Sequence, residues 1–224
     1  MVVMKHISLS LLLGMTLALM SCTTEPDDDD GWDAAKVCPE TGTNSYGMPN
    51  RGTFTDERDG QVYKYTTIGK QVWMAQNINY DVEKDACYYE EDDCRTMGRV
   101  YYPTERPCPT GWHLPSFEEW HQLFDVFGGE DAATLPLKAT HSWTPLNPGD
   151  EPNGTDDCGF SAIFAINGRE TFGYQSGFLT STITYNSKGE EDLVWTVTFR
   201  SYGRISMINN LCRESSTYVR CVKD

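Results

Sequence analysis

Four carboxylate side chains lie close together in one segment that is rich in turn-forming residues. They are Asp150, Glu151, Asp156 and Asp157. Calcium takes about six to eight oxygen ligands, and carboxylates that converge from a loop can supply several of them. The segment therefore suggests a structural calcium site, although a polar surface loop explains the same residues more simply. We expect no other cofactor.

Cys22 follows the N-terminal apolar segment and is a candidate for covalent modification. Lys5 and His6 precede an apolar run over residues 7–20, and the small residue Ser21 stands just before Cys22. This order is that of a secretory signal peptide, and the run is too short to span a bilayer comfortably. A small residue followed by cysteine is similar to the lipobox of bacterial lipoproteins, which implies lipidation of Cys22 and removal of residues 1–21. The alternative is an ordinary secreted protein.

A lipid on Cys22 would hold the mature chain on a membrane, which would then be a partner of the protein. Residues 27–30 are all aspartate and would repel anionic lipid. An acidic stretch directly after the lipidated cysteine is similar to a surface-export signal of some bacteria. We therefore expect an outer-membrane lipoprotein of the cell envelope that is exposed on the surface, with the periplasmic face as the alternative.

The charge of the chain excludes one class of partner. With 33 acidic and 18 basic residues, the formal net charge is −15. Nonspecific binding of nucleic acid needs a basic patch that neutralises phosphates, so we expect no nucleic-acid partner. The charge instead favours cations or neutral partners such as glycans.

Cysteines are frequent in the C-terminal three quarters of the chain. Six of the eight lie within residues 56–224: Cys87, Cys94, Cys108, Cys158, Cys212 and Cys221. An even set in an exported chain predicts disulfides. Cys38 lies outside this set, and we expect it to be free or bonded to another molecule.

No residue pattern points to catalysis. A thiol enzyme needs a free cysteine beside a base, but every cysteine of the set has a plausible partner. His113 and His121 do not have the spacing of a helical zinc pair, and His141 stands alone. The chain also has no nucleophile elbow and no phosphate loop. We therefore expect no enzymatic activity and assign no catalytic residue.

Several aromatic residues fall in or near the expected loops. Exposed aromatic rings suit stacking on sugars or burial against a protein, although most large aromatic residues belong to the core. Trp143 is the best candidate for an exposed ring, and Tyr174 is a second candidate for ligand binding.

Two local structures are well specified. Residues 61–67 and 71–75 are rich in β-forming residues on either side of Gly69, which predicts a hairpin. Ser116 and Glu119 form a capping box at the start of a helix, and Trp120, Leu123, Phe124 and Phe127 mark its buried face.

The remaining pattern predicts a single β-rich domain. After Gly129 the chain turns to β structure, with strand candidates at residues 160–166, 177–185, 193–200, 203–209 and 217–222. Residues 22–55 carry no sustained apolar period, and we interpret them as the lipidated cysteine followed by an acidic flexible tether. The expected fold class is α+β, with one or two helices, several antiparallel strands and disulfides, over residues 56–224.

Several strings in this segment resemble one family, the Fibrobacter succinogenes major paralogous domain. The strings are Ile68-Gly69-Lys70-Gln71-Val72-Trp73-Met74, Gly98-Arg99-Val100-Tyr101, Cys108-Pro109-Thr110-Gly111-Trp112-His113-Leu114-Pro115-Ser116, Gly159-Phe160-Ser161-Ala162 and Val219-Arg220-Cys221-Val222. The resemblance covers most of residues 56–224 and implies a C-type-lectin-like fold on an exported, lipid-anchored protein. It implies no established activity.

Three disulfide pairs are expected in a chain that resembles this family. Cys87 with Cys94 would close a small loop, and Cys108 with Cys221 would tie the middle of the domain to its last strand. Cys158 and Cys212 are particular to this chain, and we interpret them as an added bridge.

Glu151-Pro152-Asn153 is similar to the tripeptide with which carbohydrate-binding C-type lectins bind calcium and sugar. Glu151 and Asn153 are therefore further candidates for ligand binding. Those lectins also use a Trp-Asn-Asp string, whereas Trp195 is followed here by Thr196. A polar surface loop is again the simpler explanation.

Our first hypothesis is a non-catalytic binding or adhesion module on the cell surface, for a plant-cell-wall glycan or an envelope protein. Its recognition loops would be residues 138–157 and the region of residues 174–187. The second hypothesis is a structural envelope protein without a small ligand. The third is an enzyme of the formylglycine-generating kind, which belongs to the same wider fold and uses a cysteine pair.

Overall fold

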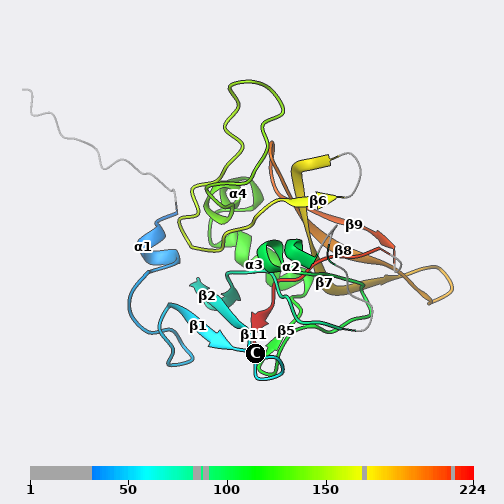
Figure 1. The fold of residues 1–224 in the computed structure, drawn as a ribbon, viewed down its shortest axis with the longest axis horizontal. Coiled ribbons are helices and arrows are strands. Elements are labelled where there is room, and N and C mark those ends of the chain that lie inside the picture. The colour runs from blue at the N-terminus through cyan, green and yellow to red at the C-terminus, as the bar shows by residue number, and fades with distance from the viewer. Residues whose placement is uncertain (1–31, 83–86, 88–90, 168–170, 213–214) are drawn as a thin grey trace, which may run out of the picture. The chain divides into compact units, whose positions relative to one another are not determined.

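Two sheets, in which nearly all described pairings are antiparallel, and a central helix form the core of the molecule (Figure 1). The computed structural model describes residues 32–82, 87, 91–167, 171–212 and 215–224. They belong to one compact unit, Gly31–Asp224. The predicted signal peptide over residues 1–21 and the lipidation site at Cys22 lie outside the described residues.

The first sheet has the strand order β1-β2-β3-β11-β5, and every pairing in it is antiparallel. Its strands are β1 (Arg51–Thr55), β2 (Val62–Ile68), β3 (Gln71–Met74), β5 (Trp112–His113) and β11 (Val222–Lys223). β2 and β3 form the predicted hairpin, and Gly69 turns the chain with a φ of 58°, which glycine adopts easily. The last strand, β11, lies between β3 and β5, so the C-terminal segment is held inside the sheet.

The second sheet has the order β4-β10-β7-β8-β9, and β6 pairs with β7. Its strands are β4 (Val100–Tyr101), β6 (Ala165–Asn167), β7 (Thr171–Tyr185), β8 (Glu191–Arg200), β9 (Ser206–Cys212) and β10 (Thr217–Tyr218). Only the short pairing of β10 with β7 is parallel among the described strand pairs. The long strands β7, β8 and β9 form a meander that overlaps the strands predicted for residues 177–185, 193–200 and 203–209, although β7 begins earlier and β9 starts and ends later than predicted.

Four helices are present in the described part of the chain: α1 (Ala34–Val37), α2 (Glu91–Met97), α3 (Phe117–Asp125) and α4 (Glu130–Leu137). None of them is long and apolar enough to cross a membrane. α3 begins with the predicted capping box, in which Ser116 Oγ accepts from the N–H of Glu119 at 3.2 Å and Glu119 Oε2 accepts from the N–H of Ser116 at 2.8 Å. This cap fixes the start of the helix that carries the core aromatic residues.

Helix α3 joins the two sheets through Trp120. The Trp120 ring lies 4.6 Å from that of Trp73 on β3 and 5.7 Å from that of Phe178 on β7, centroid to centroid. Phe160 packs edge-on against Trp120 at 5.9 Å. The buried face predicted for this helix is thus confirmed, and burial of such large rings supplies much of the stability of the core.

The predicted fold class, a β-rich α+β domain with antiparallel strands and disulfides, is confirmed. The number of helices is four among the described residues instead of one or two. The chain after Gly129 forms α4 and not the predicted β structure. The sequence pattern did not reveal this helix, because Pro136 lies in its last turn and two glycines precede it. The strand predicted for residues 160–166 begins only at Ala165.

The tether predicted over residues 22–55 is wrong for residues 32–55. This segment contains α1 and β1, and the ring of Trp32 lies 4.9 Å from that of Phe127. Cys38 is 1% exposed and forms a disulfide with Cys158, which anchors the segment to the domain. The folded domain therefore begins before residue 56.

Three disulfides are present among the described residues: Cys38–Cys158, Cys87–Cys94 and Cys108–Cys221. The last two match the predicted pairs. The predicted Cys158–Cys212 pair is wrong, because Cys158 bonds Cys38, which is therefore not a spare thiol. The backbone of Cys212 pairs with Leu193 on β8, and its side chain lies outside the described part of the structure.

Removing the Cys38–Cys158 disulfide with the double change Cys38→Ala and Cys158→Ala is expected to lower the free energy of unfolding by about 4–5 kcal/mol. The reason is the long loop that the bond closes, since its cysteines are 120 residues apart. Urea unfolding measures the loss.

The matched control is Cys87→Ala with Cys94→Ala, which opens a loop between cysteines only 7 residues apart. Its expected loss is about 2–3 kcal/mol. A smaller loss from opening the long loop than from opening the short one would contradict the anchoring role of Cys38.

Candidate functional site

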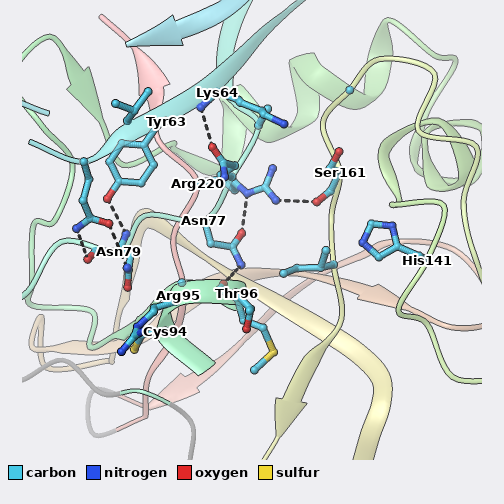
Figure 2. Close-up of a pocket in the computed structure, with 18 residues that line it drawn as sticks. Tyr63, Lys64, Asn77, Asn79, Cys94, Arg95, Thr96, His141, Ser161 and Arg220 are labelled. Atoms are coloured by element: carbon cyan, nitrogen blue, oxygen red, sulfur yellow. Dashed lines mark hydrogen bonds between the residues drawn. The ribbon is translucent and has the colours of Figure 1, made fainter. Parts of the chain in front are cut away.

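A polar pocket of about 460 Å³ lies where five distant parts of the chain meet. Its walls come from β2, from the residues after β3, from the C-terminal half of α2, from residues 159–163 and from Arg220, and His141 reaches it from the loop after α4. We call it the Arg220 pocket; Figure 2 shows its lining residues. The volume falls in the usual range for small-molecule sites.

Arg220 lines this pocket as an almost fully buried cation, 1% exposed. Its Nε donates to Asn77 Oδ1 at 2.6 Å, and its Nη2 donates to the carbonyl of Ser161 at 2.9 Å. Its Nη1 donates to the carbonyls of Met74 and Phe160. Burial lowers the pKa of Arg220 to about 9, which leaves the guanidinium charged at neutral pH. A buried charge is tolerated when acceptors surround it in this way.

The loop of residues 156–161 is shaped to present carbonyls to Arg220. Asp156 and Ser161 both have a positive φ, 52° and 53°, which costs free energy in residues other than glycine. The N–H of Ser161 donates to Asp156 Oδ1 at 2.7 Å, and Ser161 Oγ donates to Oδ2. Burial raises the pKa of Asp156, and these hydrogen bonds with the nearby charges of Arg220 and Arg51 offset only part of that effect.

Asn77 extends the network from Arg220 to helix α2. While its Oδ1 accepts from Arg220, its Nδ2 donates to the carbonyl of Met97 at 2.7 Å. Gly98 ends this helix with a φ of 81°, and a Cβ atom there would lie 2.6 Å from the Cβ of Asn77. Glycine is therefore required both by the backbone conformation and by the close approach of the two segments.

Each disulfide has one cysteine at a wall of the Arg220 pocket. Cys94 of Cys87–Cys94 lines the pocket from α2. Cys158 of Cys38–Cys158 directly precedes the lining residue Gly159, and Cys221 of Cys108–Cys221 directly follows Arg220. Three walls are thus covalently fixed, which makes the pocket preorganised.

The rim of the pocket carries side chains that solvent can reach. Lys64, Gln76, Arg95 and His141 are all exposed. Gln76 Oε1 accepts from the backbone N–H of Lys64 at 2.8 Å, which holds the two residues together. In Figure 2, Lys64, Arg95 and His141 lie around Arg220 on different sides. These side chains offer hydrogen-bond donors and acceptors to a polar ligand.

Trp143, predicted to be an exposed ring, is buried, with 4% of its surface exposed. Its Nε1 donates to the carbonyl of Ala162 at 3.0 Å, and its backbone N–H donates to Asn153 Oδ1 at 3.1 Å. The indole therefore has a polar partner inside the protein, which explains its burial. Asn153 has the structural role of holding this loop, and neither residue lines the Arg220 pocket.

Lys138 also fixes the loop after α4 that contains Trp143 and Asn153. It is 1% exposed, and its Nζ donates to the carbonyls of Pro152, Arg200 (3.0 Å) and Ser201 (3.3 Å). Burial lowers the pKa of Lys138 to about 8. The carbonyl of the proline in the Glu-Pro-Asn tripeptide is thus part of an internal cage, and the tripeptide supports the fold.

The four predicted carboxylates do not converge. Asp150 Oδ2 accepts from the N–H of Asn147 at 2.8 Å, Asp157 accepts from Thr155, Asp156 is held by Ser161, and Glu151 is exposed. No group of three or more His, Cys, Asp and Glu side chains is placed to hold a metal ion within the described ranges. The arrangement therefore does not support the predicted calcium site.

Tyr174, the remaining predicted ligand-binding residue, lies half-buried on β7 and not in a loop. Its carbonyl accepts from the N–H of Ser201 at 2.7 Å. The predicted recognition region of residues 174–187 is mostly strand, with a turn only between β7 and β8.

The residues that form the Arg220 pocket were not assigned a role from the sequence. Arg220 stands in one of the strings that resembled a family, Asn77 lies three residues after another, and each is a polar residue next to buried apolar ones. A charged residue inside the strand predicted for residues 217–222 is unusual, because charged side chains are rarely buried, and it is the one signal that points to this site.

His113 forms a second polar cluster, away from the pocket. Its Nε2 lies 2.7 Å from Glu119 Oε1, and its Nδ1 lies 2.6 Å from Asp224 Oδ1. Burial lowers the pKa of His113, but the hydrogen bonds and charges of the two carboxylates raise it by more, so the net shift is upward. The imidazole therefore links β5, α3 and the end of the chain.

Replacing Arg220 by lysine is expected to lower the free energy of unfolding by about 2–4 kcal/mol, because an ammonium cannot reproduce the planar array of donors and leaves buried acceptors unpaired. Urea unfolding measures the loss. The matched control is Arg204→Lys at an exposed position, expected to change stability by less than about 0.5 kcal/mol. Equal effects of the two changes would contradict the network.

His113→Gln is expected to destabilise the protein more at pH 5.5 than at pH 8.5. The folded-state pKa lies above the unfolded value, so the stabilisation is complete below the unfolded pKa and disappears as the pH rises through the folded one. Thermal unfolding of wild type and variant at both pH values gives the difference. A loss of the same size at both would show that the charge of His113 is not what matters.

Comparison with known proteins confirms the resemblance seen in the sequence. The model of the Fibrobacter succinogenes major domain matches residues 66–223, more than half of the chain. No curated protein and no solved structure shows significant similarity to the chain. The C-type-lectin-like fold that the resemblance implied therefore stays a prediction. The match spans strands β3 to β11. It includes every lining residue of the Arg220 pocket except residues 61–64, at the start of β2 and just before it. The chain belongs to the Fibrobacter succinogenes major domain family.

Proposed function

We propose that this protein is a non-catalytic binding module of the bacterial cell surface and that its ligand occupies the Arg220 pocket. The observation that carries the proposal is the construction of the pocket: a disulfide fixes each of three walls, and a buried guanidinium joins them. A rigid pocket loses little conformational entropy when a ligand binds, so modest contacts give useful affinity.

The lining favours a ligand with many hydroxyl groups. Gln61, Gln76, Asn79 and Thr96 place amide and hydroxyl groups around the pocket. Such groups both donate and accept, which matches sugar hydroxyls. Met97 and Ile163 supply apolar contacts for the carbon-bound faces of a ring. A short segment of a plant-cell-wall glycan fits this chemistry, and a loop of an envelope protein is the other partner that we consider.

The cellular location in the proposal rests on the sequence. The apolar run over residues 7–20, the small Ser21 and Cys22 support a lipid anchor in the outer membrane. The acidic residues that follow support export to the surface. The binding module would then stand outside the cell, where polysaccharides are accessible.

The thiol-enzyme hypothesis gains no support from the described cysteines. All six cysteines whose side chains the structure describes are in disulfides, and a nucleophilic cysteine must be free. Our proposal therefore contains no reaction step.

The mature chain carrying Cys22→Ser, which takes no lipid, is expected to bind plant-cell-wall oligosaccharides on a glycan array. Gln76→Ala is expected to weaken binding of the best ligand by about 3- to 10-fold, since it removes one or two hydrogen bonds at the rim. Isothermal titration calorimetry measures the change.

The matched control for this experiment is Gln175→Ala on β7, which lines a different hollow and should leave the affinity unchanged. Absence of binding to every oligosaccharide would refute the glycan version of the proposal. Weakening by Gln175→Ala and not by Gln76→Ala would move the site to the second sheet.

A further inference from the structure

The charge of the Arg220 pocket is opposite to that of the chain. The protein has a formal net charge of −15. Yet Lys64, Arg95 and Arg220 line the pocket, and no Asp or Glu does so among the side chains that the structure describes. A cleft lined by one sign of charge concentrates ligands of the opposite sign.

Two described carboxylates that contact lining residues of the pocket, Asp59 and Asp156, are turned to those partners. Asp59 accepts from the backbone N–H and the Nε2 of Gln61, at 2.9 Å and 2.6 Å. Asp156 accepts from Ser161 and lies close enough to interact with the charge of Arg220. Asp156 thus balances part of the charge at the floor of the pocket, and the rim cations determine what enters.

Lys64 is the rim cation best placed to receive an anion. It is exposed on β2, lines the pocket and forms no ion pair with any described carboxylate. In Figure 2 its side chain lies above Arg220 in the view, and both residues line the pocket. Its ammonium has three N–H donors that can all turn toward a ligand.

Arg220 retains one donor at the floor. A guanidinium has about five N–H groups. Four are used by the hydrogen bonds to Asn77, Met74, Phe160 and Ser161, and one N–H on Nη2 has no acceptor in the described part of the chain. A buried cationic donor without an acceptor is costly, and an oxyanion of a ligand would satisfy it.

We propose that the ligand of the Arg220 pocket is an acidic saccharide, whose carboxylate or sulfate group binds between Lys64 and Arg220 while its hydroxyls contact the amides of the rim. This inference rests on the proposed function and specifies the ligand class for the same site. The shared chemistry is a negatively charged oxygen group on a sugar, and the probes below separate its two sources.

The test is calorimetric titration of the mature chain carrying Cys22→Ser with three galactose-based probes: trigalacturonate, a sulfated galactotriose and neutral galactotriose. At least one acidic probe is expected to bind about tenfold or more tightly than the neutral one, as for a charge-assisted hydrogen bond. Preference for trigalacturonate assigns a carboxylate, and preference for the sulfated sugar assigns a sulfate ester.

Lys64→Gln is expected to weaken binding of the acidic probe about tenfold and binding of the neutral probe by much less, since glutamine keeps a hydrogen-bonding group but loses the charge. The matched control is Lys188→Gln, at an exposed turn between β7 and β8, which should change neither. An unchanged melting temperature verifies that both variants fold.

Three results would overturn the inference. If the neutral probe binds as tightly as the acidic ones and Gln76→Ala weakens it, the binding module stands but its acidic specificity fails. If Lys64→Gln weakens acidic and neutral probes equally, the charge of Lys64 does not select the ligand. If none of the three sugars binds, and the glycan array also shows no binding, both the inference and the glycan function fail.

Discussion

The buried guanidinium of Arg220 is the interaction on which the arrangement of the pocket depends. Its hydrogen bonds reach the end of β3, the amide of Asn77 and the loop of residues 156–161, and through Asn77 they reach the end of α2. A charge so deeply buried is stable only with its acceptors in place. The backbone of the loop must therefore adopt the two left-handed residues, Asp156 and Ser161, that expose its carbonyls to the cation.

Covalent bonds strengthen the same arrangement. Each of the three disulfides holds a different wall of the pocket. The one that closes the longest loop, Cys38–Cys158, ties the N-terminal segment to the domain. Lys138 and Trp143 fix the long loop after α4 by internal hydrogen bonds instead of offering it to solvent. In the function that we propose, this rigidity is useful because binding then costs little ordering of the protein.

Local sequence rules predicted the elements whose causes are local. The capping box of Ser116 and Glu119 and the glycine turn at Gly69 depend on neighbouring residues, and both were found where expected. Trp143 was misplaced because its burial depends on Ala162 and Asn153, which are distant along the chain. The partner of Cys158 could not be deduced, since spacing alone does not select between Cys38 and Cys212. The role of Arg220 was missed for the same reason: its acceptors come from segments up to 146 residues away.

Hydrogen–deuterium exchange of wild type and Arg220→Lys tests most directly whether one cation organises the whole pocket. The informative amides are those of Ile78, Arg99 and Ala162, which donate to Val219, Ile78 and Leu137 and report on three different walls. Our account predicts that all three lose protection together in the variant, while amides of the β7–β8 ladder keep theirs. Loss of protection confined to the residues around position 220, with the loop and the end of α2 unchanged, would contradict it.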